Sequence, residues 1–309
     1  MSKKPAVKKT LRVLYWNIQN GMWAEQDREY ASFVEWVKKK NPDICIFAEA
    51  STIYYDGTDK ERPWEDRYLP AHWDELAARW GHTSVFMGAQ RDNYPQVITS
   101  RYKIDSVDTF RGVRPDTVVS HGAGWARIQL EGIDKPLNIV CCHLRPFAYG
   151  YGVPKEKRKE SSAKYEGDQH RKKEAMYLLN HTVLTSSDPS GEYWLMAGDF
   201  NSRSRKDNFK YKYSDAAPSF VVQDYMMSAR SPYYDVVAES FPGIWCPSHI
   251  NGSRIDYVFV TKALLDACKE VYTNTDSYTS PARSGNVDRF WAPSDHFPII
   301  VDFNLSKLK

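Results

Sequence analysis

Residues 193–201 read Tyr-Trp-Leu-Met-Ala-Gly-Asp-Phe-Asn, an apolar run that ends in polar residues. A short apolar run of this kind predicts a β-strand. Asp199 and Asn201 follow the run directly, and a charge beside such a strand is costly to bury unless it is paired or bound to a metal. A cap or a turn explains one such residue, so the meaning of this stretch depends on the rest of the chain.

Polar residues recur beside five other predicted strands. They are Asn17 at the end of the strand 11–17, Glu49 after the strand 44–48, His143 after the strand 137–142, Asp256 within the strand 254–260, and Asp295 with His296 before the strand 298–303. Six strands with this feature are hard to explain as independent accidents. We therefore expect these side chains to converge on one site.

The remaining pattern predicts a mixed fold rich in strands. Further strands are expected at 83–87, 96–100, 104–110 and 124–130, and helices after Asp27, as N-cap, and at about 170–184. Continuously apolar strands with few helices predict two β-sheets packed face to face, with the helices outside. Residues 11–309 are expected to form one domain behind a basic, polar tail at residues 1–10.

The segment 145–170 has no hydrophobic periodicity and contains glycines, prolines, aromatic residues and a basic cluster. We expect a long surface loop that lies beside the site, because it follows His143 closely. Arg145, Lys157 and Arg158 in this segment, and Arg203 elsewhere, are candidates for contact with an anionic substrate. The alternatives are a loop ion pair for Arg145 and a solvated surface for the other three.

Composition narrows the functional classes only modestly. The formal net charge of +3 permits an anionic substrate but does not demand nucleic acid. No C-x-x-C pair suggests a zinc or redox motif, and Cys45, Cys141 and Cys142 are expected to be buried thiols. The aromatic fraction of 14% favours a β-rich core, with an aromatic surface for stacking on bases, sugars or lipid as the alternative.

The sequence contains no apolar run long enough to span a bilayer. The N-terminus, MSKKPAVKKT, is basic and polar and is followed by no apolar core, so as written it is not a signal peptide. We expect a soluble chain that is cytoplasmic as written. An exported protein whose signal had been removed would look the same, so the compartment stays open, as does the oligomeric state.

The residue types beside the six strands suit hydrolysis of a phosphoester. The reaction places negative charge on the phosphoryl and leaving oxygens, which a hard cation held by carboxylate and amide oxygens can neutralise. An amide or a histidine can hydrogen-bond the phosphoryl oxygens. A carboxylate can orient the attacking water or accept its proton, and a carboxylate behind an imidazole favours the cationic ring, which suits an anion.

Seven short motifs, in this order, resemble those of the endonuclease/exonuclease/phosphatase superfamily. They are Tyr15-Trp16-Asn17-Ile18, Pro42 through Glu49, Thr99 to Ile104, Cys142-His143-Leu144, Gly198 to Asn201, Arg254 to Phe259, and Ser294 to Pro298. Each motif alone is weak, but the ordered set spans almost the whole chain. The superfamily includes abasic-site nucleases, pancreatic deoxyribonuclease, neutral sphingomyelinases, inositol polyphosphate 5-phosphatases and tyrosyl-DNA phosphodiesterases.

The resemblance implies an α+β fold, a four-layer α/β/β/α sandwich with two mainly antiparallel sheets, and a divalent cation, Mg²⁺ or else Mn²⁺ or Ca²⁺. It implies the following roles: Glu49, Asn17 and Asp295 as metal ligands, Asp199 as the group that orients or deprotonates water, Asn201 as a phosphate contact, His296 as a donor to the phosphoryl oxygen, Asp256 as the residue that orients His296, and His143 as a second phosphate or leaving-group contact.

Two departures argue against the abasic-site nucleases. Those enzymes carry an Asp two residues after the opening Asn, where this chain has Gln19, and a Tyr where it has His143. The departures favour a branch of the deoxyribonuclease or phosphodiesterase kind. A smaller difference is Lys103, which stands where the superfamily usually has Pro.

The expected activity is metal-dependent hydrolysis of a phosphoester, above all a phosphodiester, in nucleic acid, lipid or a small molecule. The alternative is an inactive phosphate- or nucleic-acid-binding module of the same fold, but the full set of metal and proton-transfer residues argues against it. The other histidines singled out are expected to be structural or on the surface: His121, His170, His181 and His249. His249 is the most interesting, because it lies just before the strand of Asp256.

Overall fold

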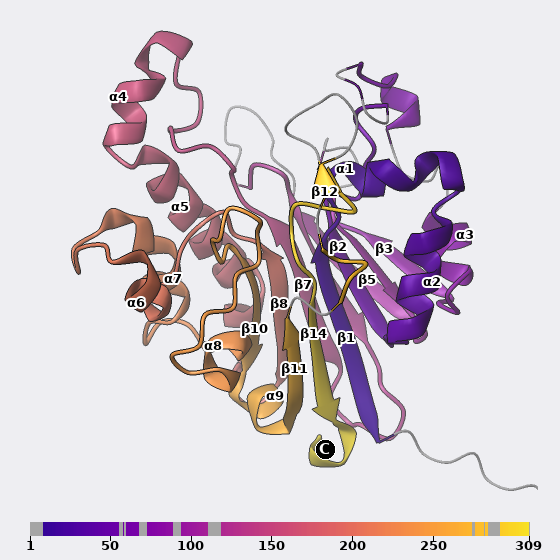
Figure 1. Ribbon diagram of the computed structural model, residues 1–309. Helices are drawn as coiled ribbons and strands as arrows, with labels where there is room; N and C mark the ends of the chain where they lie inside the picture. The colour runs from indigo at the N-terminus through magenta and orange to yellow at the C-terminus, as the bar shows by residue number, and fades with distance from the viewer. Residues whose placement is uncertain are drawn as a thin grey trace, which may run out of the picture.

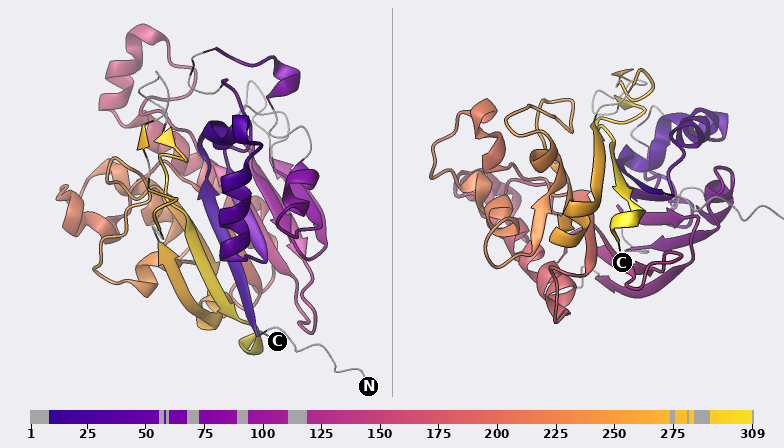
Figure 2. Two further views of the ribbon diagram at one scale, coloured as in Figure 1. Left: turned by 45° about the vertical axis from the view of Figure 1, so that its right-hand side comes forward. Right: turned by 90° about the horizontal axis from the view of Figure 1, so that it is seen from below.

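The computed structural model describes residues 9–55, 58, 60–67, 73–88, 94–110, 119–273, 276–280, 282–283 and 291–308. Within them the chain forms two six-stranded sheets and a small two-stranded ribbon of β12 (Ala282–Arg283) and β13 (Trp291–Ala292). Figure 1 and the view from below in Figure 2 show the two sheets side by side, with helices on both outer faces. Residues 1–8 of the expected tail lie outside the described residues.

The first sheet has the strand order β11-β14-β1-β2-β4-β3. Its strands are β1 (Thr10–Asn17), β2 (Ile44–Ala48), β3 (Ser84–Met87), β4 (Val97–Ser100), β11 (Cys268–Thr273) and β14 (Ile299–Asn304). β1 and β2 are parallel, and the other described neighbours are antiparallel. The C-terminal ends of β1 and β2 therefore lie at the same edge of the sheet.

The second sheet has the order β5-β6-β7-β8-β10-β9. Its strands are β5 (Ile104–Phe110), β6 (Ala123–Ile128), β7 (Leu137–His143), β8 (Tyr193–Asp199), β9 (Tyr233–Asp235) and β10 (Asp256–Thr261). Here β7 and β8 are parallel, and the other described neighbours are antiparallel. β1 packs against β8, and β2 against β7, so the two parallel pairs face each other across the core.

Nine α-helices lie within the described residues. They are α1 (Gln19–Met22), α2 (Ala31–Lys40), α3 (Trp73–Ala78), α4 (Arg158–Ala163), α5 (Glu166–His181), α6 (Asn208–Tyr211), α7 (Val221–Met226), α8 (Val236–Ser240) and α9 (Lys262–Ala267). Short 3-10 helices cover Trp23–Arg28, Trp64–Asp66, Lys155–Lys157, Val183–Thr185, Arg205–Asp207, Pro218–Phe220 and Leu305–Lys307. α2 and α3 pack on the first sheet, and α5 and α7 on the second.

The central strands are apolar on both faces because each face is covered. In β8, Leu195 and Ala197 face the first sheet, whereas Trp194 and Met196 face the layer of α5 and α7. Side chains alternate across a strand, so a strand between two apolar layers reads as a continuous apolar run. The expected sandwich of two mainly antiparallel sheets with helices outside is confirmed.

Two predictions about helices are corrected by the structure. α2 begins at Ala31 after Tyr30, which has a left-handed φ of 58°, while Asp27 belongs to the preceding 3-10 helix and is not its N-cap. The segment 145–170 is not a continuous loop, because it contains the 3-10 helix Lys155–Lys157, α4 and the first turn of α5. α4 buries only Ser161, so it has no apolar stripe by which periodicity could reveal it.

Two strands of the sheets were missed for related reasons. β9 has three residues, too few for a visible alternation, and β11 is an edge strand whose register shifts between Cys268 and Glu270. The expected buried thiols Cys45, Cys141 and Cys142 are buried and free. No described helix is both long and apolar enough to cross a membrane.

Candidate active site

The C-terminal ends of the two parallel strand pairs meet between the sheets. β1 ends at Asn17 and Glu49 follows β2, while β7 and β8 end at His143 and Asp199, which are partners in the strand register. Asn17 Nδ2 donates to Glu49 Oε1 and to Asp199 Oδ2, both at 3.2 Å. One buried amide thus joins a carboxylate of the first sheet to a carboxylate of the second.

Gly198 permits the close approach of β7 and β8 at this edge. A Cβ at Gly198 would lie 2.3 Å from the carbonyl oxygen of Cys142, so no side chain fits there. The glycine immediately before Asp199 therefore has a packing reason. It allows Asp199 and His143 to lie opposite each other at the ends of the two strands.

Glu49 is held by the backbone as well as by Asn17. It has a left-handed φ of 55°, and its Oε2 accepts a hydrogen bond from the Asn20 N–H at 2.9 Å. Burial raises the pKa of Glu49, and the neighbouring Asp295 carboxylate raises it further. Two carboxylates that face the same space in this way are stabilised together by a divalent cation.

Asp256 and His296 form a buried pair that joins the two sheets. Asp256 begins β10 and His296 precedes β14, and the Nδ1 of His296 lies 2.7 Å from Asp256 Oδ2. Tyr15 Oη and Ser248 Oγ also donate to the same carboxylate, at 2.8 and 2.7 Å. Since an ionised carboxylate only accepts hydrogen bonds, Nδ1 carries a proton and the ring orientation is fixed.

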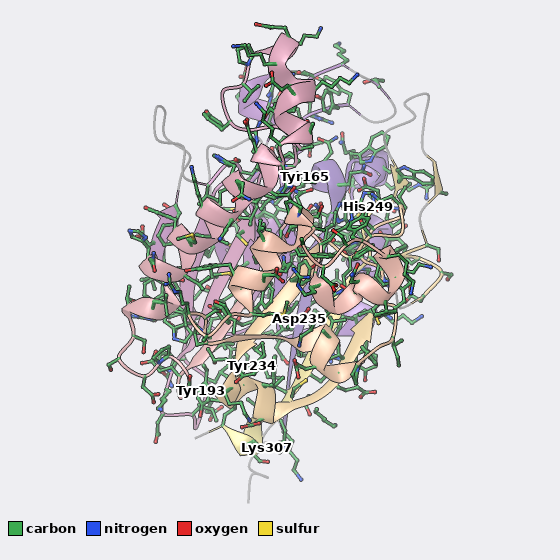
Figure 3. All side chains as sticks on the ribbon, turned by 90° about the vertical axis from the view of Figure 1, so that its left-hand side faces the viewer. Tyr165, Tyr193, Tyr234, Asp235, His249 and Lys307 are labelled. Carbon is green, nitrogen blue, oxygen red and sulfur yellow. The ribbon has the colours of Figure 1, made fainter. Side chains whose placement is uncertain are left out.

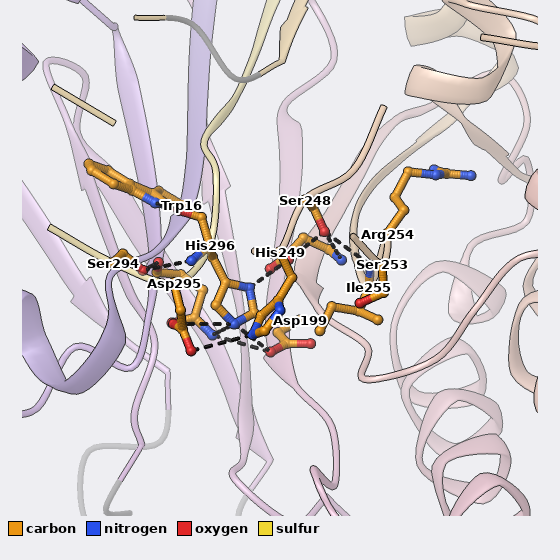
Figure 4. Close-up of polar contacts among 12 residues, drawn as sticks. Trp16, Asp199, Ser248, His249, Ser253, Arg254, Ile255, Ser294, Asp295 and His296 are labelled. Atoms are coloured by element: carbon orange, nitrogen blue, oxygen red, sulfur yellow. Dashed lines mark hydrogen bonds and ion pairs between the residues drawn. The ribbon is translucent and has the colours of Figure 1, made fainter. Parts of the chain in front are cut away.

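The electrostatics of this pair favour a charged His296. Burial alone would lower the pKa of His296, but Asp256 and then Asp295 outweigh it and raise the pKa well above its usual value. The ring is therefore an imidazolium near neutral pH. Its Nε2 lies 3.8 Å from both Asp199 Oδ2 and Asp295 Oδ1, so this N–H can be presented to an anion between them. Figure 4 marks these contacts with dashed lines.

Asp199 is buried, with 2% of its surface exposed, and burial raises its pKa well above the usual value, with Asp256 adding to the effect. Its Oδ1 accepts the backbone N–H of Asn201 at 2.8 Å, which leaves Oδ2 directed toward Asn17 and the histidines. A carboxylate with a raised pKa is a stronger proton acceptor than an exposed one. Asn201 itself has a left-handed φ of 47° and donates through Nδ2 to the Leu144 carbonyl at 3.1 Å.

His143 approaches the same carboxylate from the other side. Its Nε2 lies 3.7 Å from Asp199 Oδ2, its Nδ1 is buried without a hydrogen-bond partner among the described residues, and its ring lies 4.7 Å from that of His121. Burial lowers the pKa of His143 well below its usual value, and nearby histidines lower it further. His143 is therefore neutral where His296 is charged.

His249 supports Asp295, a contact that the sequence did not predict. Its Nε2 lies 3.3 Å from Asp295 Oδ2, and its Nδ1 accepts the backbone N–H of Asn251 at 3.1 Å. A backbone N–H only donates, so in the neutral ring the proton sits on Nε2 and is donated to Asp295. Burial raises the pKa of Asp295, but His296 and His249 outweigh it, so the pKa is lowered overall.

These side chains border one cavity of about 460 Å³. Of the residues expected at the site, Glu49, His143, Asp199, Asn201, Asp295 and His296 line it, and Asn17 and Asp256 lie fully buried next to them. No Lys or Arg in the described part of the chain lines this cavity. The tight turn from Ser248 to Ser253 brings His249 to its wall, and Figure 4 shows His249 beside Asp295 and His296.

The four basic candidates lie away from this wall. Arg145 is buried and donates to the Tyr149 and Gly150 carbonyls at 2.9 and 3.1 Å, so its contacts are with the protein and not with the cavity. Arg203 lies 5.6 Å from the ring centroid of Tyr211. Lys157 and Arg158 are exposed at the start of α4.

Several contributors to the site were missed or underrated in the sequence. His249 and His121 were expected to be structural, yet both line the cavity, as does Asn20. Ser248 and Tyr15 hold Asp256. A signal existed for His249, which lies seven residues before Asp256, and for Tyr15, which lies in β1 within the motif that contains Asn17. Asn20, His121 and Ser248 reach the site through the path of the chain beyond the strands, which the sequence pattern does not reveal.

The oxygen donors fit a hard divalent cation. Glu49 and Asp295 line the cavity and supply carboxylate oxygens, and the fully buried amide of Asn17 lies next to Glu49. The Asp295 carboxylate raises the pKa of Glu49, which supports a cation between the two carboxylates. A further set of ligand atoms, from His249, Asp295 and His296, lies within 4.8 Å. The His249 nitrogen that faces Asp295 is Nε2, which carries the proton in the neutral ring, so it suits hydrogen bonding better than metal binding.

A sequence model described as the endonuclease/exonuclease/phosphatase family matches residues 14–296 of the chain. No curated protein matches the sequence. Solved structures nevertheless share the fold. An AP endonuclease from Archaeoglobus fulgidus is 16% identical, with a TM-score of 0.58 over 95% of this chain and 99% of that one.

Two eukaryotic structures are similar to the same extent. Truncated Caenorhabditis elegans TDP2 is 14% identical, with a TM-score of 0.59 over 96% of this chain and 97% of that chain. The human Nocturnin catalytic domain with a bound sulfate anion is also 14% identical, with a TM-score of 0.58 over 96% and 93%. At these identities the likeness concerns the fold.

Proposed function

The chain belongs to the endonuclease/exonuclease/phosphatase family, and we propose that it hydrolyses phosphodiester bonds with the help of a divalent cation. Family membership supports a phosphoester hydrolase in general. The observation that carries the finer proposal is the convergence of Asp199, the Asp256–His296 pair and the Glu49–Asp295 carboxylates on one cavity. A proton acceptor, a charged donor and a cation site are the parts that water attack on a phosphate requires.

The cation in this proposal is Mg²⁺, with Mn²⁺ or Ca²⁺ as alternatives, held by Glu49, Asp295 and Asn17. When bound, it would neutralise negative charge on the phosphate and on the leaving oxygen. Oxygen donors favour these hard cations over thiolate-seeking metals. His249 keeps Asp295 oriented for this role, because its hydrogen bond occupies one carboxylate oxygen and leaves the other directed to the cavity.

Asp199 is proposed to orient the attacking water and accept its proton. Its Oδ1 is fixed by the Asn201 N–H, and Oδ2 faces the cavity between His143 and His296. The raised pKa, caused by burial and by Asp256, suits proton acceptance. Asn201 contributes by holding Asp199 and by presenting its amide at the cavity wall.

His296 is proposed to donate its Nε2–H to a phosphoryl oxygen. Asp256, held by Tyr15 and Ser248, keeps the ring charged and correctly turned. A preoriented cationic donor stabilises the charge that develops on that oxygen. His143 is proposed as a neutral contact to a second phosphate oxygen or to the leaving oxygen, since its Nε2 lies near the same carboxylate.

A phosphodiester suits the cavity better than a phosphomonoester. A monoester is a dianion near neutral pH, and its recognition usually draws on permanently charged Arg or Lys side chains. Neither residue type, within the described chain, lines the cavity, where His296 is the cationic group. Among the described residues the cavity thus offers one cationic side chain, His296, which pairs with the single negative charge of a diester.

The proposal is tested with bis-p-nitrophenyl phosphate and p-nitrophenyl phosphate. The protein should hydrolyse the diester in Mg²⁺ or Mn²⁺, lose turnover in EDTA and regain it when the cation is restored. The monoester should be the poorer substrate. Full activity in EDTA would sink the metal-dependent mechanism, and no turnover of any diester would leave an inactive binding module as the better description.

A further inference from the structure

A stacked aromatic surface borders the active-site cavity. Phe147, Tyr149 and Tyr151, which we call the aromatic platform, surround the guanidinium of Arg145, whose central carbon lies 5.1 to 5.5 Å from all three ring centroids. The rings of Phe147 and Tyr149 are stacked, with centroids 5.1 Å apart and planes 21° from parallel. Arg158 lies 4.5 Å from the Tyr149 centroid. Aromatic rings and guanidinium groups thus form one layered unit.

Contacts from α5 hold this unit in place. Arg171 Nη1 donates to the carbonyl oxygens of Arg145 and Phe147, at 2.9 and 3.0 Å, and Glu174 Oε2 accepts the Arg145 N–H at 3.0 Å. The backbone passes so close to Gly167 that a Cβ there would lie 2.3 Å from the Phe147 carbonyl. The platform is therefore preformed, which lowers the entropy cost of binding a ligand.

Phe147 is both exposed and part of the cavity wall. Tyr149 covers one side of its ring, yet 48% of the residue remains accessible to solvent. Phe147 and Pro146 line the same cavity as Asp199 and His296. A large apolar ring that is fixed at the mouth of an active site and left exposed is typical of a ligand-binding surface.

A basic surface continues outward from the platform. Three lysines, which we call the α4 lysines, are exposed on the 3-10 helix before α4 and on its first turn: Lys155, Lys157 and Lys159. None of them forms an ion pair within the described residues. Figure 1 shows α4 projecting beyond the strand ends, on the side of the second sheet. Figure 3, in which Tyr165 after α4 and His249 at the site are labelled, shows the same projection from the side.

We propose that the aromatic platform stacks on a nucleobase next to the scissile phosphate and that the α4 lysines bind the following backbone phosphates. The substrate class is therefore single-stranded nucleic acid. This inference rests on the proposed phosphodiesterase function and names its substrate. An unpaired base can turn its face onto Phe147, whereas a base inside a duplex is covered by its neighbours.

The charge pattern favours nucleic acid over a lipid surface. A membrane-binding segment needs several apolar side chains at its outermost point. Here the 3-10 helix carries Lys155 and Lys157, and the first turn of α4 carries Arg158 and Lys159. The exposed ring of Phe147 lies at the cavity and not on α4. Alternating aromatic and basic contacts are the pattern that binds a single strand through its bases and phosphates.

The test is binding of fluorescein-labelled oligodeoxythymidylate, measured by anisotropy in EDTA so that no strand is cut. Phe147→Leu, which keeps an apolar side chain but removes the ring, should bind at least about fivefold more weakly, the scale of one lost base-stacking contact. Phe147→Trp, which keeps an aromatic ring, should bind the oligonucleotide about as tightly as the wild type. The matched control is Phe209→Leu on α6, an exposed ring (41%) outside this cavity, which should bind like the wild type.

Charge and base contributions are separated by two further comparisons. Lys157→Ser/Lys159→Ser should weaken binding and reduce its salt dependence, whereas the control pair Lys38→Ser/Lys39→Ser, exposed at the end of α2, should change neither. An oligonucleotide with abasic sites throughout keeps the phosphates but has no bases. The wild type should bind this abasic strand more weakly than the natural strand. Its affinity for the abasic strand should equal that of Phe147→Leu.

The proposal is overturned if Phe147→Leu binds the oligothymidylate as tightly as wild type, or if the abasic strand binds as well as the natural one. It is also overturned if the α4 lysines are needed for anionic phosphatidylserine vesicles and not for the oligonucleotide. These outcomes leave the phosphodiesterase proposal untouched, because that proposal is tested by cation-dependent turnover of bis-p-nitrophenyl phosphate and not by oligonucleotide binding.

Discussion

His296 and His143 approach the same carboxylate oxygen of Asp199 from opposite sheets, at 3.8 and 3.7 Å, and both are buried. Their pKa values nevertheless move in opposite directions. His296 has Asp256 2.7 Å behind its ring, whereas the Nδ1 of His143 has no partner among the described residues. The difference teaches that burial makes a histidine neutral unless a fixed carboxylate opposes it.

The two sides of the cavity therefore present histidines in different charge states. On the His296 side, a hydrogen-bonded chain from Tyr15 and Ser248 through Asp256 maintains a positive charge. On the His143 side, burial and then the neighbouring His121 and His296 lower the pKa and maintain a neutral ring. The charged His296 and the neutral His143 lie on either side of the Asp199 carboxylate. They can therefore contact different oxygens of the same phosphate.

The largest effect is expected from removing the charged donor or the base. His296→Ala and Asp199→Asn should each lower kcat by at least ~100-fold, the scale of one charge-stabilising or proton-transfer group. His143→Ala should cost only about tenfold, because a neutral contact stabilises less charge. Steady-state kinetics on bis-p-nitrophenyl phosphate at saturating Mg²⁺ measure this, with circular dichroism as the folding control. Equal losses for the two histidine variants would remove the distinction drawn between them.

The variant Asp256→Asn should make His296 resemble the neutral His143. Asp256→Asn removes the charge that raises the pKa of His296, so burial should then dominate, as it does for His143. Wild-type His296 keeps its proton above the ordinary histidine pKa of about 6.5, so activity should persist into the alkaline range. The variant loses the proton at lower pH, so the alkaline limb of its kcat profile should move toward lower pH.

The matched measurement for that variant is the ring titration itself. NMR of the His296 imidazole in both proteins should show the pKa falling in Asp256→Asn, together with a loss in kcat of about tenfold or more. An alkaline limb that did not move, despite reduced activity, would mean that Asp256 acts through ring orientation alone.

Glu49→Gln should differ in kind from the changes around the two histidines. It removes one charge from the proposed cation site without touching the proton-transfer groups, so the apparent cation affinity should fall by about tenfold or more. Excess Mn²⁺ should recover much of the activity, whereas it should recover none in Asp199→Asn. Calorimetric titration with Mn²⁺ gives the affinity independently of turnover; an unchanged affinity would remove Glu49 from the ligand set.

The smallest effect is expected at His249, which acts through Asp295. His249→Ala removes the hydrogen bond to Asp295 Oδ2 and should weaken Mn²⁺ binding by about tenfold or less, the lower end for residues that orient a ligand. His249→Gln retains an N–H donor and should recover part of the loss. Stronger binding in His249→Ala would contradict the inferred support.

Much of the fold could be predicted from the sequence, because the physical causes of its strands are local. The apolar runs of β1, β2, β7 and β8 have to be strands covered on both faces, and the polar residues at their ends have to be paired or bound. The same reasoning collected Asn17, Glu49, His143 and Asp199 without knowledge of the sheet order. The short helix α4 and the three-residue β9 were not predictable, because neither contains enough buried residues to produce a period.

The sequence by itself determined the eight polar groups that stand beside apolar strands, because each strand fixes where its polar residue emerges. Only the tertiary structure decided their states. The pKa directions of His296 and His143 depend on what lies behind each ring, and the tautomer of His249 depends on a turn seven residues before Asp256. Likewise Arg145 faces its own loop and not the cavity, because the carbonyls of Tyr149 and Gly150 lie within its reach. Charge, tautomer and direction are set by neighbours distant in sequence or by loop geometry, and no local pattern encodes them.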